Sequence, residues 1–456
     1  MTEKTFFRRL TANALWLYAD RLLRGGLSLV VGIIVARYLG PQQYGEYSYV
    51  LGLVVLLASI GTLGLDLIIV RMLVNSPNDE PEILGTSTVL RLGASGVAYI
   101  ITVSAVVAGK PGDGTALALA LLVGLSPVFQ VTGVIDLFFQ SRIHSSNTVK
   151  CKLGAGAVMI TVRILLIYWG AGLIAFAATV AGELALVAIC LVYRFYRYGG
   201  RIQLWHYNRH RALLMIREGW PLMAASAAIA IYLRIDQVML EYMNGDVAVG
   251  LFSVAARLTE IFVIAATVLA QTIFPAMSDL YEASLYRYNR TLSAIMFGVF
   301  WVSFIFSGLV SIFSSHIIIM IFGNRYVAAG SILSIYVFNT VTMSVSVIFT
   351  PKYILDGIAN ISFYGTIAGA VFSVAANLML IPRYGVLGAA WSALLAQLVP
   401  TLFVGLFFRR DIGVFFFRAP FAASDMLFLL RRFRSFPRGH RTSPFPDYAA
   451  HTRNSG

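Results

Sequence analysis

The residues most able to do chemistry in this chain are charged side chains within long apolar segments. The first segment carries Asp20, Arg21 and Arg24, at spacings of three and four residues that place them on one face of a helix. Because Asp20 can neutralise only one of the two arginines, we expect Arg21 and Arg24 to face a hydrated cavity. A guanidinium binds phosphate and carboxylate oxygens through paired hydrogen bonds, which indicates an anionic ligand.

Later apolar segments carry further ionisable residues, each of which costs about 2.5–3.5 kcal/mol at membrane depth unless it faces a cavity or a partner. Those predicted to line a central cavity are Arg163, Arg234 and Arg257. Arg163 and Glu183 could instead form an ion pair that joins two helices. We expect Arg91 to extend toward the cytoplasmic face, and Asp66 and Asp136 to be solvated near that interface.

No group of residues has the spacing of a catalytic or metal site. There is no Ser/His/Asp grouping and no phosphate-binding loop, and five of the six histidines lie in loops or in the C-terminal tail. The predicted outer loops are short, so the pattern favours moving a substrate over transforming one. Cys151 and Cys190 are far apart in sequence, in or beside apolar segments, and are predicted to be buried, inert thiols.

The composition places these residues in a membrane protein. Of 456 residues, 58% are hydrophobic and 12% charged, against about 45–50% and 25% in soluble domains. Apolar runs of about 20 residues, each able to cross a hydrocarbon core of about 30 Å, predict an all-α protein with about twelve transmembrane helices. Their approximate bounds are 12–36, 48–71, 84–108, 116–139, 150–169, 172–195, 218–240, 248–274, 291–322, 328–350, 361–381 and 386–408. The ninth is too long for one straight helix and is expected to tilt or to extend past the bilayer. Gly170 is predicted to turn a tight hairpin between the fifth and sixth.

The basic residues predict the orientation. If the N-terminus is cytoplasmic, the outer loops hold only a few basic residues, which are Arg37, Lys110, Arg325 and Arg383. This bias predicts that both termini are cytoplasmic, and it accounts for the net charge of +14 without a nucleic-acid partner. The run from Ala12 contains charges and lacks a cleavage site, so we expect a retained first helix rather than a signal peptide.

A basic segment between the sixth and seventh spans divides the chain into two six-helix bundles. The predicted units are an N-terminal bundle, a basic cytoplasmic linker, a C-terminal bundle and a basic cytoplasmic tail, at 1–196, 197–217, 218–408 and 409–456. The stretches "ARYLGPQQYGEYSYVLGLV" and "LEYMNGDVAVGLFSVAARL" indicate a parallel repeat, with chance similarity as the alternative. Residues 411–434 suit a helix at the cytoplasmic interface, and 435–456 are predicted to be disordered.

Five stretches resemble a known family in order and placement. They are "NALWLYADRLLRGGLSLVVGIIVARYLGPQQYGEYSYV" (13–50), "LGLDLIIVR" (63–71), "RIDQVMLEYMNGDVAVGLFSVAARLTE" (234–260), "IFGNRYVAAGSILSIY" (321–336) and "IPRYGVLGAAWSALLAQ" (381–397). The chain resembles the polysaccharide-transporter branch of the MOP flippase superfamily, the lipid-linked oligosaccharide flippases of bacterial surface-glycan pathways. The resemblance implies two MATE-like bundles that open alternately to the two sides of the bacterial inner membrane.

The resemblance also implies a substrate, a polyprenyl-diphosphate-linked oligosaccharide, and no enzymatic step. By position, the cavity cations that it implies first are Arg24, Arg234 and Arg257. No cofactor is expected beyond coupling to a proton or sodium gradient, for which the candidate acids are Asp20, Glu183, Asp236 and Glu260. The expected partners are membrane lipids and other polysaccharide-assembly proteins.

Two other functions fit the sequence less well. A multidrug exporter of the same superfamily would favour acidic and aromatic linings for cationic drugs, so the arginines count against it. A non-transporting membrane protein of glycan assembly would be favoured by a large outer domain or an acidic catalytic pair, and the sequence has neither.

Overall fold

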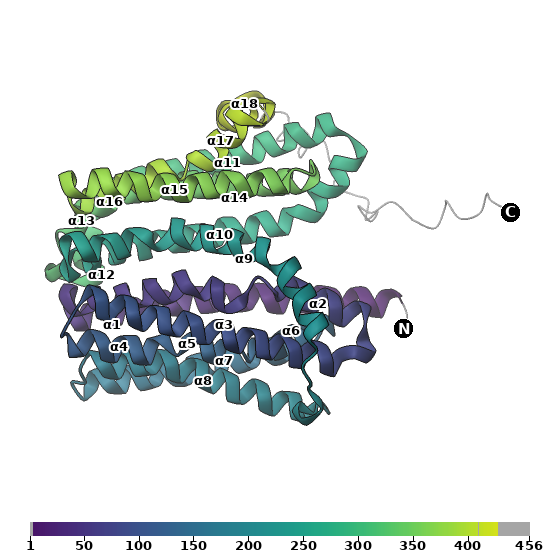
Figure 1. The fold of residues 1–456 in the computed structure, drawn as a ribbon. Coiled ribbons are helices and arrows are strands. Elements are labelled where there is room, and N and C mark those ends of the chain that lie inside the picture. The colour runs from purple at the N-terminus through teal and green to yellow at the C-terminus, as the bar shows by residue number, and fades with distance from the viewer. Residues whose placement is uncertain (1–2, 409, 427–456) are drawn as a thin grey trace.

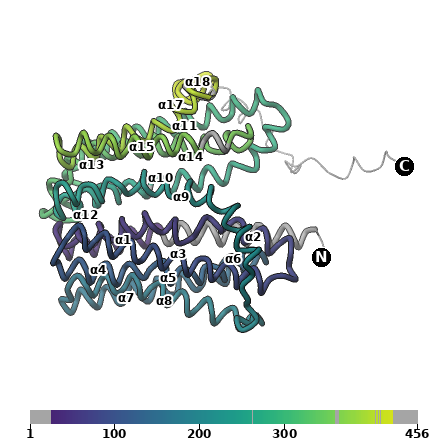
Figure 2. The backbone as a smooth tube through the Cα atoms, viewed as in Figure 1, coloured from purple at the N-terminus to yellow at the C-terminus, as the bar shows by residue number. Residues whose placement is uncertain are grey.

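A computed structural model describes the backbone of residues 3–408 and 410–426, and the side chains of these ranges except at 3–24, 261, 359–362, 406 and 412. Within this part of the chain every regular element is a helix, which confirms the predicted all-α class. Figures 1 and 2 show two groups of long helices that lie side by side, with α1–α8 in one group and α10–α17 in the other.

The helices of the N-terminal half are α1 (Glu3–Thr62), α2 (Asp66–Asn75), η1 (Pro77–Asp79), α3 (Glu80–Gly109), α4 (Gly114–Gly124), α5 (Ser126–Gln130), α6 (Gly133–Ser141), α7 (Ser146–Tyr168) and α8 (Leu173–Arg197). Those that follow are η2 (Ile202–Leu204), α9 (Arg209–Asn244), α10 (Asp246–Ala283), α11 (Leu285–Ile312), α12 (Ser314–Phe322), η3 (Asn324–Tyr326), α13 (Ala329–Tyr336), α14 (Asn339–Leu355), α15 (Ala359–Tyr384), α16 (Val386–Ala396), α17 (Val399–Phe407), α18 (Arg410–Arg418) and η4 (Ala419–Phe421).

Eleven described segments are long and apolar enough to cross a membrane. The first, Gly25–Asn75, has 51 residues and would reach about 75 Å as one straight helix, more than twice a hydrocarbon core. It is broken at Gly40, whose φ of 78° is left-handed, and Pro41 follows. The chain runs leftward to this break in Figure 1 and returns to α2 at the right. With two crossings in this segment, the count agrees with the twelve predicted spans.

Two features of the predicted spans can be compared directly with the structure. The tight hairpin is confirmed, since Gly170 has a φ of 69° and only Trp169–Gly172 separate α7 from α8. The ninth span is not one straight helix, as its length predicted, because α11 ends at Ile312 and a separate α12 follows Phe313. Two adjacent serines begin α12, and serine side chains compete with the helical hydrogen bonds of the backbone.

The two cysteines were predicted to be free thiols, and this prediction was wrong. Cys151 of α7 and Cys190 of α8 form a disulfide, with Cα atoms 5.6 Å apart. The hairpin explains the pairing, because Cys151 lies 19 residues before Gly170 and Cys190 lies 20 residues after it. In an antiparallel helix pair, residues at equal distances from the turn lie at the same level.

Arg91 has a carboxylate partner in the structure. Its side chain is buried, at 4% exposure, and forms an ion pair with Asp66. Asp66 remains largely exposed, as predicted, and Asp136 is paired with Lys152 at 2.5 Å. A carboxylate partner offsets the cost of burying a guanidinium.

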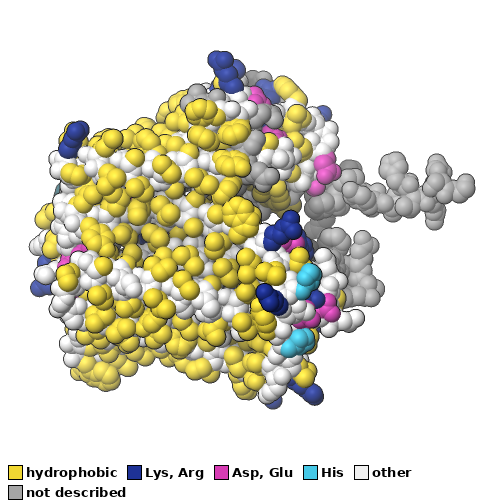
Figure 3. All heavy atoms as spheres, in the orientation of Figure 1, with side chains coloured by type: hydrophobic (Ala, Val, Ile, Leu, Met, Phe, Trp, Pro, Cys, Tyr) yellow, Lys and Arg dark blue, Asp and Glu magenta, His cyan; other side chains and the backbone are white. Residues whose placement is uncertain are grey.

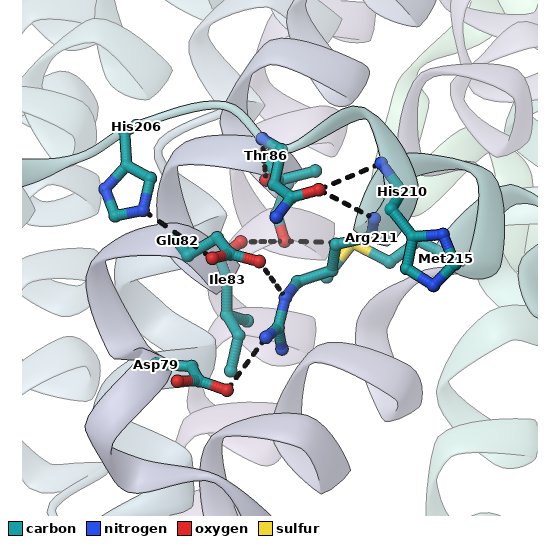
Figure 4. A network of polar contacts seen from close by, with 10 residues as sticks. Asp79, Glu82, Ile83, Thr86, His206, His210, Arg211 and Met215 are labelled. Atoms are coloured by element: carbon teal, nitrogen blue, oxygen red, sulfur yellow. Dashed lines mark hydrogen bonds and ion pairs between the residues drawn. The ribbon is translucent and has the colours of Figure 1, made fainter.

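Figure 4 shows how the basic linker is attached to the N-terminal half. Arg211, in the first turn of α9, donates to Glu82 at 2.6 Å and to Asp79 at 2.8 Å, at the start of α3. The backbone N–H of Asn208 donates to the Thr86 hydroxyl at 3.1 Å. The start of α9 is therefore held by α3, although α9 then continues into contact with α10 and α15.

The surface agrees with a membrane environment. Figure 3 shows apolar side chains over most of the visible face, while the charged and histidine side chains gather mainly toward the ends of the helices. After α17 the chain forms the short helix α18 with arginines at both its ends. The predicted interfacial helix at 411–434 is described only as far as residue 426, and the predicted disordered segment, 435–456, lies outside the described residues.

Candidate functional site

Two glycine turns have the same backbone conformation in the two halves. Gly40 has φ 78° and ψ 172°, and Gly245 has φ 79° and ψ 179°. Each is followed by a long helix, and the two turns lie 205 residues apart in the two stretches that the sequence predicted to be a repeat. A left-handed φ at both positions favours glycine.

The helices after these turns pack against each other reciprocally. A Cβ atom at Gly45 would lie 1.7 Å from the Asp246 carbonyl oxygen, and one at Gly250 would lie 2.0 Å from the Pro41 carbonyl oxygen. The offset from Gly45 to Gly250 and from Pro41 to Asp246 is again 205 residues. Reciprocal contacts of equivalent residues are the property of a two-fold related interface. The two halves therefore meet as pseudo-symmetric partners, backbone against backbone.

Side chains bridge the halves at the same end of the molecule, here called the Gly40 end (Gly40, Lys110 and Gly245). Lys110 of the N-terminal half forms ion pairs with two residues of the C-terminal half, Glu241 at 2.8 Å and Asp246 at 2.5 Å. Burial lowers the pKa of Lys110, but its hydrogen bonds to the two carboxylates raise the pKa by more, so the net shift is upward. The Gly40 end is therefore closed by an ion cluster as well as by packing.

A cavity of about 400 Å³ lies between the halves, bounded by α1, α7, α8, α9 and α10. Six of its lining residues are ionisable as acids or strong bases, and these are Lys152, Arg163, Glu183, Arg234, Arg257 and Glu260. Equivalent residues of the repeat, Ser48 and Ser253, both contribute to the lining. The lining thus combines four basic and two acidic side chains with hydroxyl groups.

Three of the four basic side chains in the lining have carboxylate partners. Arg163 pairs with Glu183 at 3.0 Å, and Arg234 pairs with Glu260 at 3.1 Å. Lys152 pairs with Asp136. The sequence left two interpretations open for such charges, a place in the cavity lining or an ion pair that joins two helices. Both hold for these residues.

Arg257 differs from the other cavity cations in its partners. Its Nη2 donates to the carbonyl oxygen of Ser28 at 2.7 Å and to the Ser28 hydroxyl at 3.1 Å, and its Nη1 donates to the Tyr44 hydroxyl at 3.5 Å. Among the described residues no carboxylate lies within 4.0 Å of this guanidinium, and its buried Nε has no hydrogen-bond partner. Arg257 thus has donor capacity and charge available for an anionic ligand.

The structure brings together five of the nine predicted site residues, which are Arg163, Glu183, Arg234, Arg257 and Glu260. Asp236 is not among them, because its side chain is buried inside the C-terminal half, where the Asn377 amide donates to it at 2.5 Å. The side chains of Asp20, Arg21 and Arg24 lie outside the described residues.

Sequence reasoning missed several contributors to the cavity. Lys152 lines it but was not among the predicted site residues. Gln237 lines the cavity, and a Cβ at Gly52 would lie 2.9 Å from its Oε1. In the described part of the chain no three His, Cys, Asp or Glu side chains gather to hold a metal ion.

The fold is that of the MOP superfamily of membrane transporters. It superposes on an inward-facing multidrug resistance MATE family transporter with a TM-score of 0.69 and 15% identity, covering 87% of this chain and 98% of that one. It superposes on the lipid II flippase MurJ in an inward closed conformation with a TM-score of 0.72 and 12% identity, covering 94% of both chains.

Sequence comparison then identifies the family. Residues 10–281 match the model of the polysaccharide biosynthesis protein family, and the chain belongs to that family. It is 21% identical over 417 residues to the capsular polysaccharide biosynthesis protein CapF of Staphylococcus aureus, covering 87% of this chain and 99% of that protein. The predicted family and fold class are confirmed.

Proposed function

We propose that this protein is a flippase that moves a polyprenyl-diphosphate-linked oligosaccharide across the bacterial inner membrane by alternating access, without transforming it. The observation that carries the proposal is Arg257, a cavity cation with no carboxylate within 4.0 Å among the described residues. A guanidinium in this state suits a diphosphate, whose oxygens it can bind through paired hydrogen bonds.

The need for such a cavity follows from the cost of desolvation. A diphosphate and its sugars lose their hydrogen bonds to water when they enter hydrocarbon, and each unpaired polar group then costs several kcal/mol. A cavity between the halves that carries serine hydroxyls and arginines replaces those bonds, while the polyprenyl chain can remain in the bilayer. Family membership and the MurJ fold support transport over catalysis.

The predicted cavity cations enter the proposal in different roles. Arg257 binds the diphosphate directly, while Arg163 and Arg234 present ion pairs that can exchange partners with the substrate. Arg21 and Arg24, near the start of α1, would extend the basic lining. A cationic drug would require the opposite balance of charge, so the lining favours an anionic substrate over a multidrug exporter's cargo.

Coupling to a proton or sodium gradient is part of the proposal. Asp236 is a buried carboxylate with no cation within 4.0 Å among the described residues, so a proton or a sodium ion would compensate its charge. Glu183 and Glu260 would couple transport to the gradient by binding the ion in place of their partners Arg163 and Arg234. Asp20 is the fourth candidate. The proposal also includes two cytoplasmic termini, and membrane lipids and other polysaccharide-assembly proteins as partners.

The test uses export in a bacterium that depends on this gene for its surface polysaccharide. Arg257→Ala should abolish surface polysaccharide and cause lipid-linked precursor to accumulate, with the protein present in the membrane at normal level. Arg201→Ala, which removes an exposed arginine of the linker, is the matched control and should export normally. Undiminished export by Arg257→Ala would overturn the proposal.

A further inference from the structure

Arg257 is held by the half of the molecule to which it does not belong. Arg257 lies on α10 of the C-terminal half, whereas Ser28 and Tyr44, which accept its hydrogen bonds, lie on α1 of the N-terminal half. Its position in the cavity therefore depends on how close α1 lies to α10, and that distance is set by the contact between the two halves.

Gly32 makes this contact possible. A Cβ atom at Gly32 would lie 2.0 Å from Nε and 2.2 Å from Cζ of Arg257, so any larger residue would displace the guanidinium. The equivalent contact across the pseudo-two-fold axis joins Gly52 to Gln237, with the same offset of 205 residues. The Gly32–Arg257 contact is thus part of the interface that closes the Gly40 end.

We propose that Gly32 and Ser28 are positioning residues for Arg257, which hold its guanidinium in the cavity only while the Gly40 end is closed. This rests on the proposed function, and it adds the point at which substrate affinity is tied to conformation. When the Gly40 end opens, α1 separates from α10 and Arg257 loses both the Ser28 oxygens and the wall at Gly32. The anion site is then dismantled, and the ligand is released to the side that has opened.

This arrangement supplies the differential affinity that alternating access requires. A ligand shifts a conformational equilibrium only by as much as its affinities for the two states differ. An arginine fixed by neutral acceptors is preorganised for an anion without being neutralised by a carboxylate. A free arginine must instead lose side-chain entropy when it binds, which weakens the complex.

The experiment measures binding of farnesyl diphosphate, a soluble polyprenyl diphosphate, to the full chain in lipid nanodiscs. Gly32→Ala should weaken binding by about tenfold or more, the loss expected when a charge-assisted contact is misplaced. Gly26→Ala is the matched control on the same helix, because a Cβ there would have no atom within 4 Å. It should bind within about twofold of the wild type.

A second variant separates positioning from local damage. Gly45→Ala leaves Arg257 untouched but places a Cβ 1.7 Å from the Asp246 carbonyl oxygen, which forces the halves apart. It should also weaken farnesyl diphosphate binding severalfold. If Gly32→Ala is not monodisperse, the binding measured for Gly45→Ala tests the positioning role in its place. Wild-type binding by Gly32→Ala or Gly45→Ala, with binding lost in Arg257→Ala, would overturn the positioning role alone. Wild-type binding by Arg257→Ala would overturn the proposed function itself.

Discussion

Glycine occupies two interface positions of the N-terminal half, Gly32 and Gly52, where the equivalent residues of the C-terminal half are Gln237 and Arg257. The backbone contacts of the two halves are reciprocal, but one half supplies the gaps and the other supplies the long polar side chains that fill them. The symmetric part of the interface closes the molecule at the Gly40 end. The asymmetric part places in the cavity Arg257, which has no carboxylate partner among the described side chains. A duplicated fold can thus acquire a single anion site without losing the packing of its repeat.

The largest effect is expected from the symmetric part. Gly250→Ala would place a Cβ 2.0 Å from the Pro41 carbonyl oxygen, and backbone cannot yield as a flexible side chain can. The halves should then fail to close at the Gly40 end, and export should be lost. In a Ser253→Cys background without Cys151 and Cys190, a membrane-impermeant thiol reagent applied outside should label residue 253 faster than in the parent.

The control for that measurement is Gly96→Ala on α3, because a Cβ at Gly96 would have no atom within 4 Å. It should export and label as the parent does. If Gly250→Ala exports normally, the backbone contact is not part of a closed state through which transport passes.

An intermediate effect is expected at the ion cluster that joins the halves. Lys110→Met leaves Glu241 and Asp246 beside each other without their cation, which costs about 3–5 kcal/mol for a buried pair. The Tm of the purified protein should fall by roughly 3–5 °C. The double variant with Glu241→Gln should recover part of the loss, and a Tm equal to that of the wild type in Lys110→Met would show that the cluster does not hold the halves together.

The raised pKa of Lys110 predicts how the difference in Tm between the wild type and Lys110→Met depends on pH. A group whose pKa is raised by folding contributes stability that is fully present below its unfolded value, about 10.4 for lysine, and is lost as the pH rises through the folded value. The difference in Tm between wild type and Lys110→Met should therefore be constant from about pH 7 to about pH 9. A difference that disappears within this range would contradict the assignment of charge.

The smallest effect is expected at the linker. Arg211 is only partly buried, and its pairs with Asp79 and Glu82 stabilise the fold by about 1 kcal/mol or less. Arg211→Ala should leave export intact but speed tryptic cleavage after Arg201 or Arg209, because the linker is less firmly held to α3. Unchanged cleavage would show that the backbone bond of Asn208 to Thr86 is sufficient.

The sequence predicted five of the six charged side chains that line the cavity, all but Lys152, and the reason is energetic. Arg163, Arg234, Arg257 and Glu260 lie in apolar segments, where a charge must face a cavity or a partner, and the structure gives each of them such a place. Which of these two applies depends on the neighbouring helix. The ion pair of Arg234, and the lack of a carboxylate beside Arg257 in the part of the chain whose side chains are described, could therefore not be predicted.

Two further outcomes depended on the direction in which side chains face around the axis of a helix. Asp236 follows Arg234 by two residues, and two residues turn a helix by about 200°, so one side chain faces the cavity and the other the bundle interior. Gly40 and Gly45 were visible in the repeat with Gly245 and Gly250. The contacts of Gly32 with Arg257 and of Gly52 with Gln237 could not be predicted, because they join residues 225 and 185 positions apart in the sequence. The cysteine pairing was predictable in principle from the hairpin at Gly170, since both lie at nearly equal distance from it.

The most direct test of the account compares Arg257 with an arginine that has a carboxylate partner. In proteoliposomes that contain a polyprenyl-diphosphate-linked oligosaccharide, the translocation rate should fall by about two orders of magnitude in Arg257→Ala, the loss of a charge-assisted contact of up to about 3 kcal/mol. The paired double variant Arg234→Gln with Glu260→Gln should lose less, because it removes a charge already compensated. Translocation by Arg257→Ala at or above the rate of the double variant would contradict the account.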